Sequence, residues 1–403
     1  MLNMYRGLSP LLYCIALARF ITALGSFVMP MMVIILHDKL AISADLTGLV
    51  VAMFAGLILI GSILGGFLCD KFKSSNVLIL SMCIILIGYI LSFFNPNDLY
   101  LIYCLGISQL GIGLTYTSTL TVSLKASTQS NRPNVISLNY LCFNLGAAIG
   151  PAIAGFLYSE NYIYIYLGSA ASILMALLAI LFGLSKNNDS THQLADSNHI
   201  NDEHSSSINI SRTLVCIFAS ICFFISFTYA MLMFVLPIKM NALFDSSGPQ
   251  FFGYIMSVNG LSVILFTPLI LKIFNKTNFT IALSISPLLY IIAIILLLPA
   301  TSFVVVVILS TIFWSIGEII YVNYSELYIT DKANNKNIGR LSSVPVISYQ
   351  LSSIIAPLIS GLFIQLGNEN APLYIAIILC TLSLIFIFMI LFSEQKMKNK
   401  ITA

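Results

Sequence analysis

Charged side chains are scarce in this sequence, and their scarcity excludes most classes of protein. Asp, Glu, Lys and Arg together make up only 8% of the 403 residues, while apolar residues make up 59%. The mean hydropathy is +0.98. Soluble globular domains carry about 25% charged residues, so this composition predicts an integral membrane protein.

Several chemical signatures are also missing. The basic residues behind the net charge of +3 are spread over short segments without a basic aromatic patch, which argues against nucleic-acid binding. The sequence has no GxxxxGK[ST] loop, so we expect no ATP site. The eight cysteines lie in or beside apolar runs without CxxC spacing, and no histidine lies deep in such a run. We therefore expect no cofactor, no metal site and no enzymatic activity.

Apolar runs recur along the whole chain, and each is long enough to cross a hydrocarbon core of about 30 Å as a helix. They lack the alternation of transmembrane barrel strands, so the predicted fold class is all-α. Twelve spans are expected, at residues 8–36, 45–69, 76–94, 98–124, 133–158, 162–184, 212–239, 249–273, 279–299, 301–328, 338–366 and 371–393.

One long polar segment divides these spans into six and six. It covers residues 185–211 and reads SKNNDSTHQLADSNHINDEHSSSINIS, a composition typical of a flexible linker. Its three histidines fit no tight metal-ligand spacing. The predicted domains are therefore an N-terminal bundle at 1–184, a linker at 185–211 and a C-terminal bundle at 212–403.

Lys and Arg are distributed unevenly over the predicted loops. With the N-terminus inside, fifteen of them fall on the cytoplasmic side, and only Lys39 and Lys239 fall outside. Because cytoplasmic loops carry the excess of positive charge, both termini and the linker are predicted to be cytoplasmic. The expected location is the cell membrane, with the lipid bilayer as a partner.

The two halves resemble each other at an offset of about 205 residues. GGFLCDKFKSSN (65–76) aligns with TPLILKIFNKTN (267–278), and GPAIAG (150–155) aligns with APLISG (356–361). The second pair matches Pro151 with Pro357 and Gly155 with Gly361. A duplicated six-helix unit explains both matches, and two such repeats are typical of a carrier that works by alternating access.

The segment after the second span, GGFLCDKFK (65–73), resembles the loop motif G-x-L-x-D-R-x-G-R-[RK] of the major facilitator superfamily. Gly66 corresponds to the close-packing glycine, Asp70 to the acid, and Lys71 replaces the usual arginine. The resemblance implies a gating role for these three residues. It covers essentially the full chain, and it implies a 12-helix secondary transporter built from two pseudo-symmetric bundles and active as a monomer.

The fifth span carries a second motif. Gly146, Gly150, Pro151 and Gly155 are similar to the G-x-x-x-G-P-x-x-G-G signature of the family's drug/proton antiporter branch, which implies gating and export. Independently of the name, small residues at this spacing allow close helix packing, and packing alone is the alternative interpretation.

The fourth span departs from that branch. GISQLGIG (106–113) lacks the usual arginine, so the proton relay attributed to that residue is not expected here. Ser108 and Thr115 share one helix face instead, suited either to lining a wet cavity or to hydrogen-bonding across helices.

Glu318 is the strongest functional lead. It lies near the middle of an apolar span, where an ionised carboxylate costs roughly 2.5 kcal/mol or more. At the helical period it shares a stripe with Trp314 and Tyr321, so we expect a solvated face and a proton-coupling role. A packing role, with the carboxyl bonded to a neighbouring backbone, is the alternative.

Arg19 lies in the first span on one stripe with Thr22 and Ser26. Arginine stays protonated and needs a partner in hydrocarbon. Arg19 is expected to bind an anionic substrate group or to pair with Glu318, and a structural tie to carbonyls is the alternative. In the family arrangement the first, fourth, seventh and tenth spans line the cavity. Further predicted lining residues are Asn139, Asn144, Tyr229, Met233, Tyr349 and Gln350.

The predicted function is a proton-coupled exporter of small amphipathic molecules, with protons as the second partner. One alternative is export of a polar or anionic metabolite, such as a carboxylate-type metal chelator. Uptake by symport is a further alternative within transporters. A receptor that binds a ligand without transporting it is the alternative from another class.

Overall fold

The computed structural model describes residues 7–128, 131–187, 212–274, 279–299, 303–332 and 338–402, and within these ranges it contains helices and connecting turns but no strand. Among the described residues, ten helical runs are long and apolar enough to cross a membrane, and two of them, Pro10–Lys39 and Thr213–Ile273, each hold more than one successive helix. The chain is therefore a multi-pass membrane protein. The helix Tyr100–Lys125 is not among these ten runs, so the count of twelve spans stays a prediction.

The helix bounds lie close to those of the predicted spans. The elements before the linker are α1 (Pro10–Leu24), α2 (Val28–Ile34), η2 (Ile35–Lys39), α3 (Ala44–Lys71), α4 (Ser74–Phe94), α5 (Tyr100–Lys125), α6 (Arg132–Asn161) and α7 (Ile163–Asn187). Those after it are α8 (Arg212–Phe244), η3 (Asp245–Ser247), α9 (Gly248–Ile273), α10 (Phe279–Leu297), α11 (Val304–Lys332), α12 (Ile338–Gln365) and α13 (Ala371–Thr402). Most of the predicted linker, including its histidines, lies outside the described residues.

The chain forms two compact units that exchange short segments. The first unit holds α1, α2, η2, α4 to α7 and α3 from Met53 onward, and it also includes Phe244–Gly260. The second unit holds α8 up to Leu243, α9 from Leu261 onward and α10 to α13, together with Ser43–Ala52. The predicted domain boundaries, with a linker at 185–211, stay a prediction.

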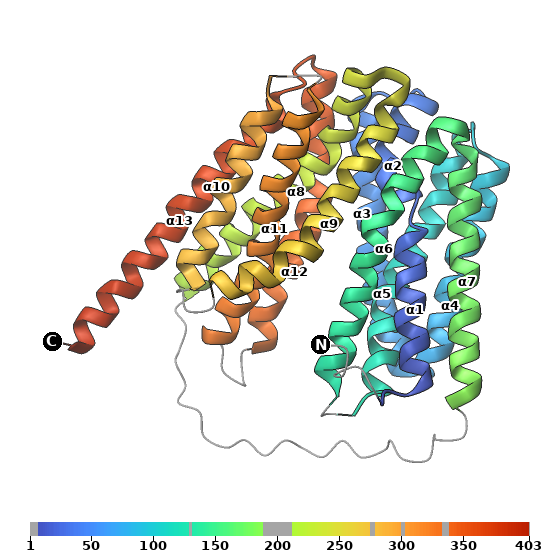
Figure 1. Ribbon diagram of the computed structural model, residues 1–403, viewed down its shortest axis with the longest axis horizontal. Coiled ribbons are helices and arrows are strands. Elements are labelled where there is room, and N and C mark those ends of the chain that lie inside the picture. Colours follow the sequence, from blue (N-terminus) through green and yellow to red (C-terminus); the bar gives the residue numbers. More distant parts are fainter. Residues whose placement is uncertain are drawn as a thin grey trace. The chain divides into compact units, whose positions relative to one another are not determined.

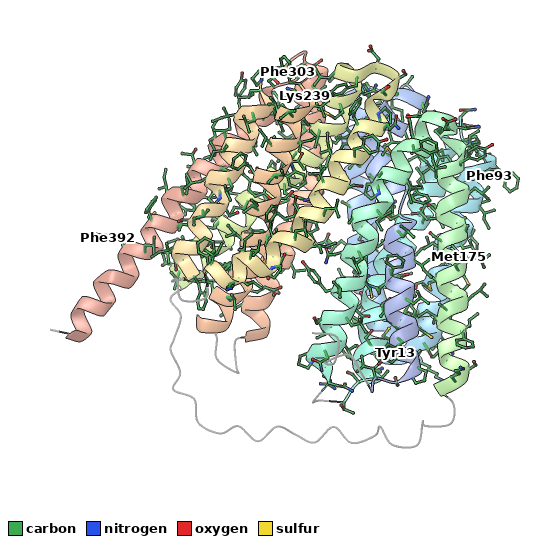
Figure 2. All side chains as sticks on the ribbon, in the orientation of Figure 1. Tyr13, Phe93, Met175, Lys239, Phe303 and Phe392 are labelled. Carbon is green, nitrogen blue, oxygen red and sulfur yellow. The ribbon has the colours of Figure 1, made fainter. Side chains whose placement is uncertain are left out.

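Within the first unit, α1 packs against both α6 and α7, and α4 packs against α5 and α7 (Figure 1). Within the second unit, α10 packs against α11 and α13. Large apolar side chains cover the outside of both units; Met175 and Phe392 project away from α7 and α13, with exposed fractions of 53% and 71% (Figure 2). Apolar surface of this extent is what a bilayer would cover.

The first predicted span, residues 8–36, is not one continuous helix. Helix α1 ends at Leu24 and α2 begins at Val28, with Gly25 as the C-cap of α1. A Cβ at Gly25 would collide with the side chain of Ser172 on α7, whose hydroxyl donates to the Gly25 carbonyl at 3.4 Å. Glycine and serine often occur where a helix kinks. The pair Gly25-Ser26 therefore indicated an interruption, although the apolar residues on both sides of it suggested one continuous helix.

The two exchanged segments are held by matching contacts. In the first unit, a Cβ at Gly155 of α6 would lie 2.7 Å from the Pro249 carbonyl oxygen of α9, and a Cβ at Gly253 would collide with the Pro151 carbonyl. In the second unit, a Cβ at Gly48 of α3 would collide with the Pro357 carbonyl of α12, and one at Gly361 with the Ala44 carbonyl. We call these contacts the α6–α9 joint and the α3–α12 joint.

Candidate functional site

Arg19 lies half-buried on α1 and carries the positive charge of the first candidate site. Its guanidinium carbon is 4.7 Å from the ring centre of Phe143 on α6, and it lies within electrostatic range of Tyr116 on α5. Among the described residues of the first unit, no carboxylate and no hydrogen-bond acceptor reaches the guanidinium. Its N–H donors therefore require water or an anionic ligand.

The glycines of α6 explain how Phe143 reaches Arg19. A Cβ at Gly146 would lie 2.5 Å from the Phe20 carbonyl oxygen, and one at Gly150 would lie 2.6 Å from the Leu24 carbonyl oxygen. Only glycine permits this approach of two backbones. Because Phe143 precedes Gly146 by one helical turn, the same close approach brings its ring to the level of Arg19.

Thr22 and Ser26 follow Arg19 along the first span. The Thr22 hydroxyl donates to the Arg19 carbonyl oxygen at 3.1 Å, a local bond within the helix. Ser26 is half-buried and lies between α1 and α2, where the helix is interrupted. The predicted stripe therefore ends at the break.

Glu318 lies half-buried on α11 in the second unit. It is within electrostatic range of Tyr229 on α8 and of Tyr290 on α10. One turn earlier, the Trp314 ring makes an edge contact with Tyr229, with ring centres 6.0 Å apart. The Tyr290 ring packs against Gly317, where a Cβ would lie 3.2 Å from its Cδ2 atom. Two phenols from two neighbouring helices thus lie within electrostatic range of the carboxyl group.

The rest of the α11 stripe is buried, so the expectation of a solvated face was wrong within the second unit. Trp314 is 1% exposed and Tyr321 is 8% exposed. The Tyr321 hydroxyl is 2.9 Å from the Ser226 hydroxyl of α8, and the Ser315 hydroxyl donates to the Thr311 carbonyl at 2.6 Å. Serine and threonine hydroxyls can donate a hydrogen bond to a carbonyl of their own helix, so a polar stripe does not require contact with water.

The polar stripe of α5 faces α4. Ser108 is completely buried, and its Cβ would lie 2.9 Å from a Cβ added at Gly88 of α4. The Thr115 hydroxyl donates to the Ser81 hydroxyl at 2.8 Å. The Ser108 hydroxyl donates to the Leu105 carbonyl of its own helix at 2.7 Å, so of the two residues Thr115 forms the predicted hydrogen bond across helices.

The remaining predicted lining residues are scattered. The Asn139 amide donates to the Ser123 hydroxyl of α5 at 3.1 Å, while that of Asn144 donates to the Tyr140 carbonyl of its own helix at 2.8 Å. Tyr349 of α12 is 48% exposed. The half-buried members of the set are Tyr229, Met233 and Gln350.

The loop motif at the end of α3 needs one correction. The close-packing glycine is Gly65, where a Cβ would lie 3.1 Å from the Leu114 carbonyl oxygen, whereas at Gly66 it would make only an ordinary contact at 3.9 Å. The G-x-L-x-D spacing still fits Gly66, Leu68 and Asp70, so only the close-packing role moves to Gly65 and the alignment of the motif is unchanged. Asp70 and Lys71 are exposed at the end of α3.

The sequence analysis missed four residues, which are Phe143 and Tyr116 near Arg19, Tyr290 near Glu318, and the separate residue Gln109. Aromatic residues are too common in membrane helices to single out one phenylalanine or tyrosine. Gln109 of α5 is completely buried, and neither amide atom has a hydrogen-bond partner in the described part of the chain. Such a group needs water or a ligand, and its place in an apolar span was the available signal.

Comparison with known proteins settles the family. The family model described as Major Facilitator Superfamily matches residues 15–353. The chain belongs to the major facilitator superfamily. Proteins of this superfamily are transporters and not enzymes, so the predictions of a transporter and of no enzymatic activity are confirmed.

Two curated relatives come from Bacillus subtilis (strain 168), and both are described as uncharacterized MFS-type transporters. YqjV is 22% identical over 94% of this chain and 92% of its own length. YttB is 28% identical, but that match spans only 42% of this chain and 43% of YttB. Neither confirms the drug/proton antiporter branch.

Solved structures share the major facilitator fold at low identity. A POT family transporter in complex with a thioalcohol-conjugated peptide has a TM-score of 0.77 and 18% identity, covering 96% of each chain. A mutant form of the nucleoside transporter NupG has a TM-score of 0.67 and 13% identity, covering 94% of this chain and 98% of its own.

Proposed function

We propose that this protein is a proton-coupled exporter of small amphipathic molecules that carry an anionic group, working by alternating access through twelve spans. The observation that carries the proposal is Arg19, a cation in a membrane-spanning helix without a carboxylate partner in its own unit. A permanent charge at such a position is costly and marks a substrate or ion pathway. The proposed location is the cell membrane, with both termini cytoplasmic.

The surroundings of Arg19 favour an amphipathic anion over a polycarboxylate chelator. Its neighbours Phe143 and Tyr116 are aromatic, and no second basic residue lies deep in any predicted span. A chelator with several carboxylates would need several cationic partners, whereas one guanidinium beside aromatic rings suits one anionic group on an apolar body.

Glu318 is the proposed proton carrier. It holds a proton while its site is closed to water and releases it when the cavity opens on the cytoplasmic side. Tyr229 and Tyr290 support this role because their neutral phenols can donate to the carboxylate without supplying a permanent counter-charge. An arginine or lysine in their place would hold the carboxylate ionised.

The glycine motifs supply the proposed moving parts. Gly146, Gly150, Pro151 and Gly155 let α6 slide on α1 and α9, because backbone-to-backbone contacts without side chains present few steric barriers. Asp70 and Lys71, with Gly66, are proposed to act in gating at the cytoplasmic end of α3.

The test is transport into inverted membrane vesicles under an imposed pH gradient, with a panel of aromatic carboxylates, a polycarboxylate chelator and a cationic dye. We expect gradient-driven accumulation of the aromatic carboxylates alone. Arg19→Gln should abolish it. Accumulation of the dye with the carboxylates excluded would overturn the substrate class, and transport only into right-side-out vesicles would overturn export.

Glu318→Gln tests the coupling separately. The neutral amide keeps the shape of the side chain but cannot carry the proton. We expect substrate binding within about threefold of the unmodified protein, since that range is below 1 kcal/mol, and a complete loss of accumulation driven by the pH gradient. Full gradient-driven transport in this variant would remove the coupling role, and Glu326→Gln, on the same helix, is the matched control.

A further inference from the structure

We propose that Arg19 and Phe143 form a subsite that selects carboxylates attached to a flat aromatic ring, with Phe143 as the residue that holds the guanidinium in position. This inference rests on the proposed function and names its substrate class more narrowly. Its geometric basis is the guanidinium carbon of Arg19 lying 4.7 Å from the centre of the Phe143 ring.

The cation–π contact takes the place of the partner that arginine usually has inside a membrane. Elsewhere in proteins a buried guanidinium is held by a carboxylate, which also neutralises it. Here the described residues of the first unit supply only an aromatic face and the nearby Tyr116. A ring face holds the cation in place without cancelling its charge, so the charge stays available for a ligand.

The same contact determines which N–H donors of Arg19 remain available to a ligand. A ring that covers one face of a guanidinium leaves the in-plane N–H groups along its edges, and these match the two oxygens of a carboxylate. A bound carboxylate would therefore extend its organic part alongside Phe143 and Tyr116. Tyr116 is 44% exposed, so it offers an aromatic surface rather than a packed core position.

A flat ring gains most from this arrangement. An aromatic ring joined directly to the carboxylate lies in the same plane as the carboxylate and can stack on a neighbouring ring, whereas a flexible alkyl chain cannot. The position of Phe143 beside Arg19 depends on Gly146, which leaves room for the Phe20 carbonyl and so allows α6 to approach α1. Selectivity for aromatic over aliphatic carboxylates should therefore depend on the ring at position 143.

The experiment compares two probes on the purified full-length protein, 2-naphthoate and octanoate, by equilibrium dialysis. We expect Phe143→Leu to weaken 2-naphthoate binding about tenfold, which corresponds to about 1.4 kcal/mol, and octanoate binding less than about threefold. Phe143→Tyr keeps the ring and should keep the preference. Arg19→Lys should weaken both probes, because an ammonium lacks the planar fork.

Phe156→Leu is the matched control, because Phe156 lies on the same helix with 52% of its surface exposed and should leave the ratio of the two affinities unchanged. An equal loss of both probes in Phe143→Leu, or no loss, would overturn the inference. The ratio of the two affinities also separates a specific role of Phe143 from misfolding, because misfolding lowers the bound fraction of both probes alike.

Failure of this inference is distinguishable from failure of the proposed function. If vesicles export 2-naphthoate and octanoate equally well in the Phe143→Leu variant and the unmodified protein, the subsite is wrong and the exporter stands. If the purified protein prefers 2-naphthoate through Phe143 but vesicles show no gradient-driven flux, the subsite stands and the exporter is wrong.

Discussion

Gly146 and Gly150 of α6 are important for packing because they have no side chain. Each places its Cα against a carbonyl oxygen of α1, so the two backbones touch where other residues would hold them apart. The side chains of Arg19 and Phe143, which form the proposed subsite, lie beside this contact. At the scale of the residue, these two glycines therefore determine where the side chains of Arg19 and Phe143 meet.

Gly146→Ala should be destabilising. The new methyl group would lie 2.5 Å from the Phe20 carbonyl oxygen, and α1 or α6 must shift to make room. Overpacking of this kind costs about 1–3 kcal/mol. We expect a lower midpoint of thermal unfolding in detergent. Gly56→Ala is the control, since a Cβ there meets nothing within 4 Å; an equal effect of both changes would contradict the assignment.

Individual residues differ in how readily the sequence reveals them. Arg19 and Glu318 stand out because ionisable groups are rare in apolar spans. Phe143 and Tyr290 do not, since the chain has 27 phenylalanines and 19 tyrosines and only packing distinguishes one from another. The burial of Trp314 and Tyr321 was also beyond the helical wheel, which groups side chains on one face without saying what covers that face.

At the scale of the element, the helices themselves were predictable from the length of the apolar runs and from the Lys and Arg between them. The interruption of the first span was not, because residues on both sides of it are apolar. Its cause is a contact across the bundle: the Ser172 side chain of α7 fills the space where a Cβ at Gly25 would lie. Tertiary contacts of this kind leave little trace in a local pattern.

The break gives a reciprocal prediction. Gly25→Ala should lower the unfolding midpoint because the methyl group collides with Ser172, by an amount within the range of about 1–3 kcal/mol for overpacking. Ser172→Gly in the same chain removes the colliding atoms and should recover most of the loss. A double variant no more stable than Gly25→Ala would show that the collision is not the cause. Thermal unfolding of the two single variants and the double variant measures the coupling.

At the scale of the whole molecule, the duplication is visible in the contacts as well as in the sequence. The α6–α9 joint uses Pro151, Gly155 and Gly253, and the α3–α12 joint uses Pro357, Gly361 and Gly48. The repeat offset of about 205 residues relates Gly48 to Gly253 as it relates Gly155 to Gly361. Each joint brings a helix from one half of the sequence against a helix from the other.

The equivalence of the joints can be tested with Gly48→Leu and Gly253→Leu. Each change places a side chain against a proline carbonyl and should force that joint apart. We expect similar losses of unfolding free energy, within about 0.5 kcal/mol of each other, and a similar reduction in gradient-driven transport. Gly56→Leu should have a much smaller effect in both assays. A strong loss in only one of the two joint variants would contradict their equivalence.

The joints have a consequence for how this protein can change over evolutionary time. Their touching atoms belong to the main chain and to glycine Cα groups, so they depend little on which side chains lie around them. A hybrid that takes its second half from a relative such as YqjV would therefore need Gly253, Pro357 and Gly361 for these two joints to form.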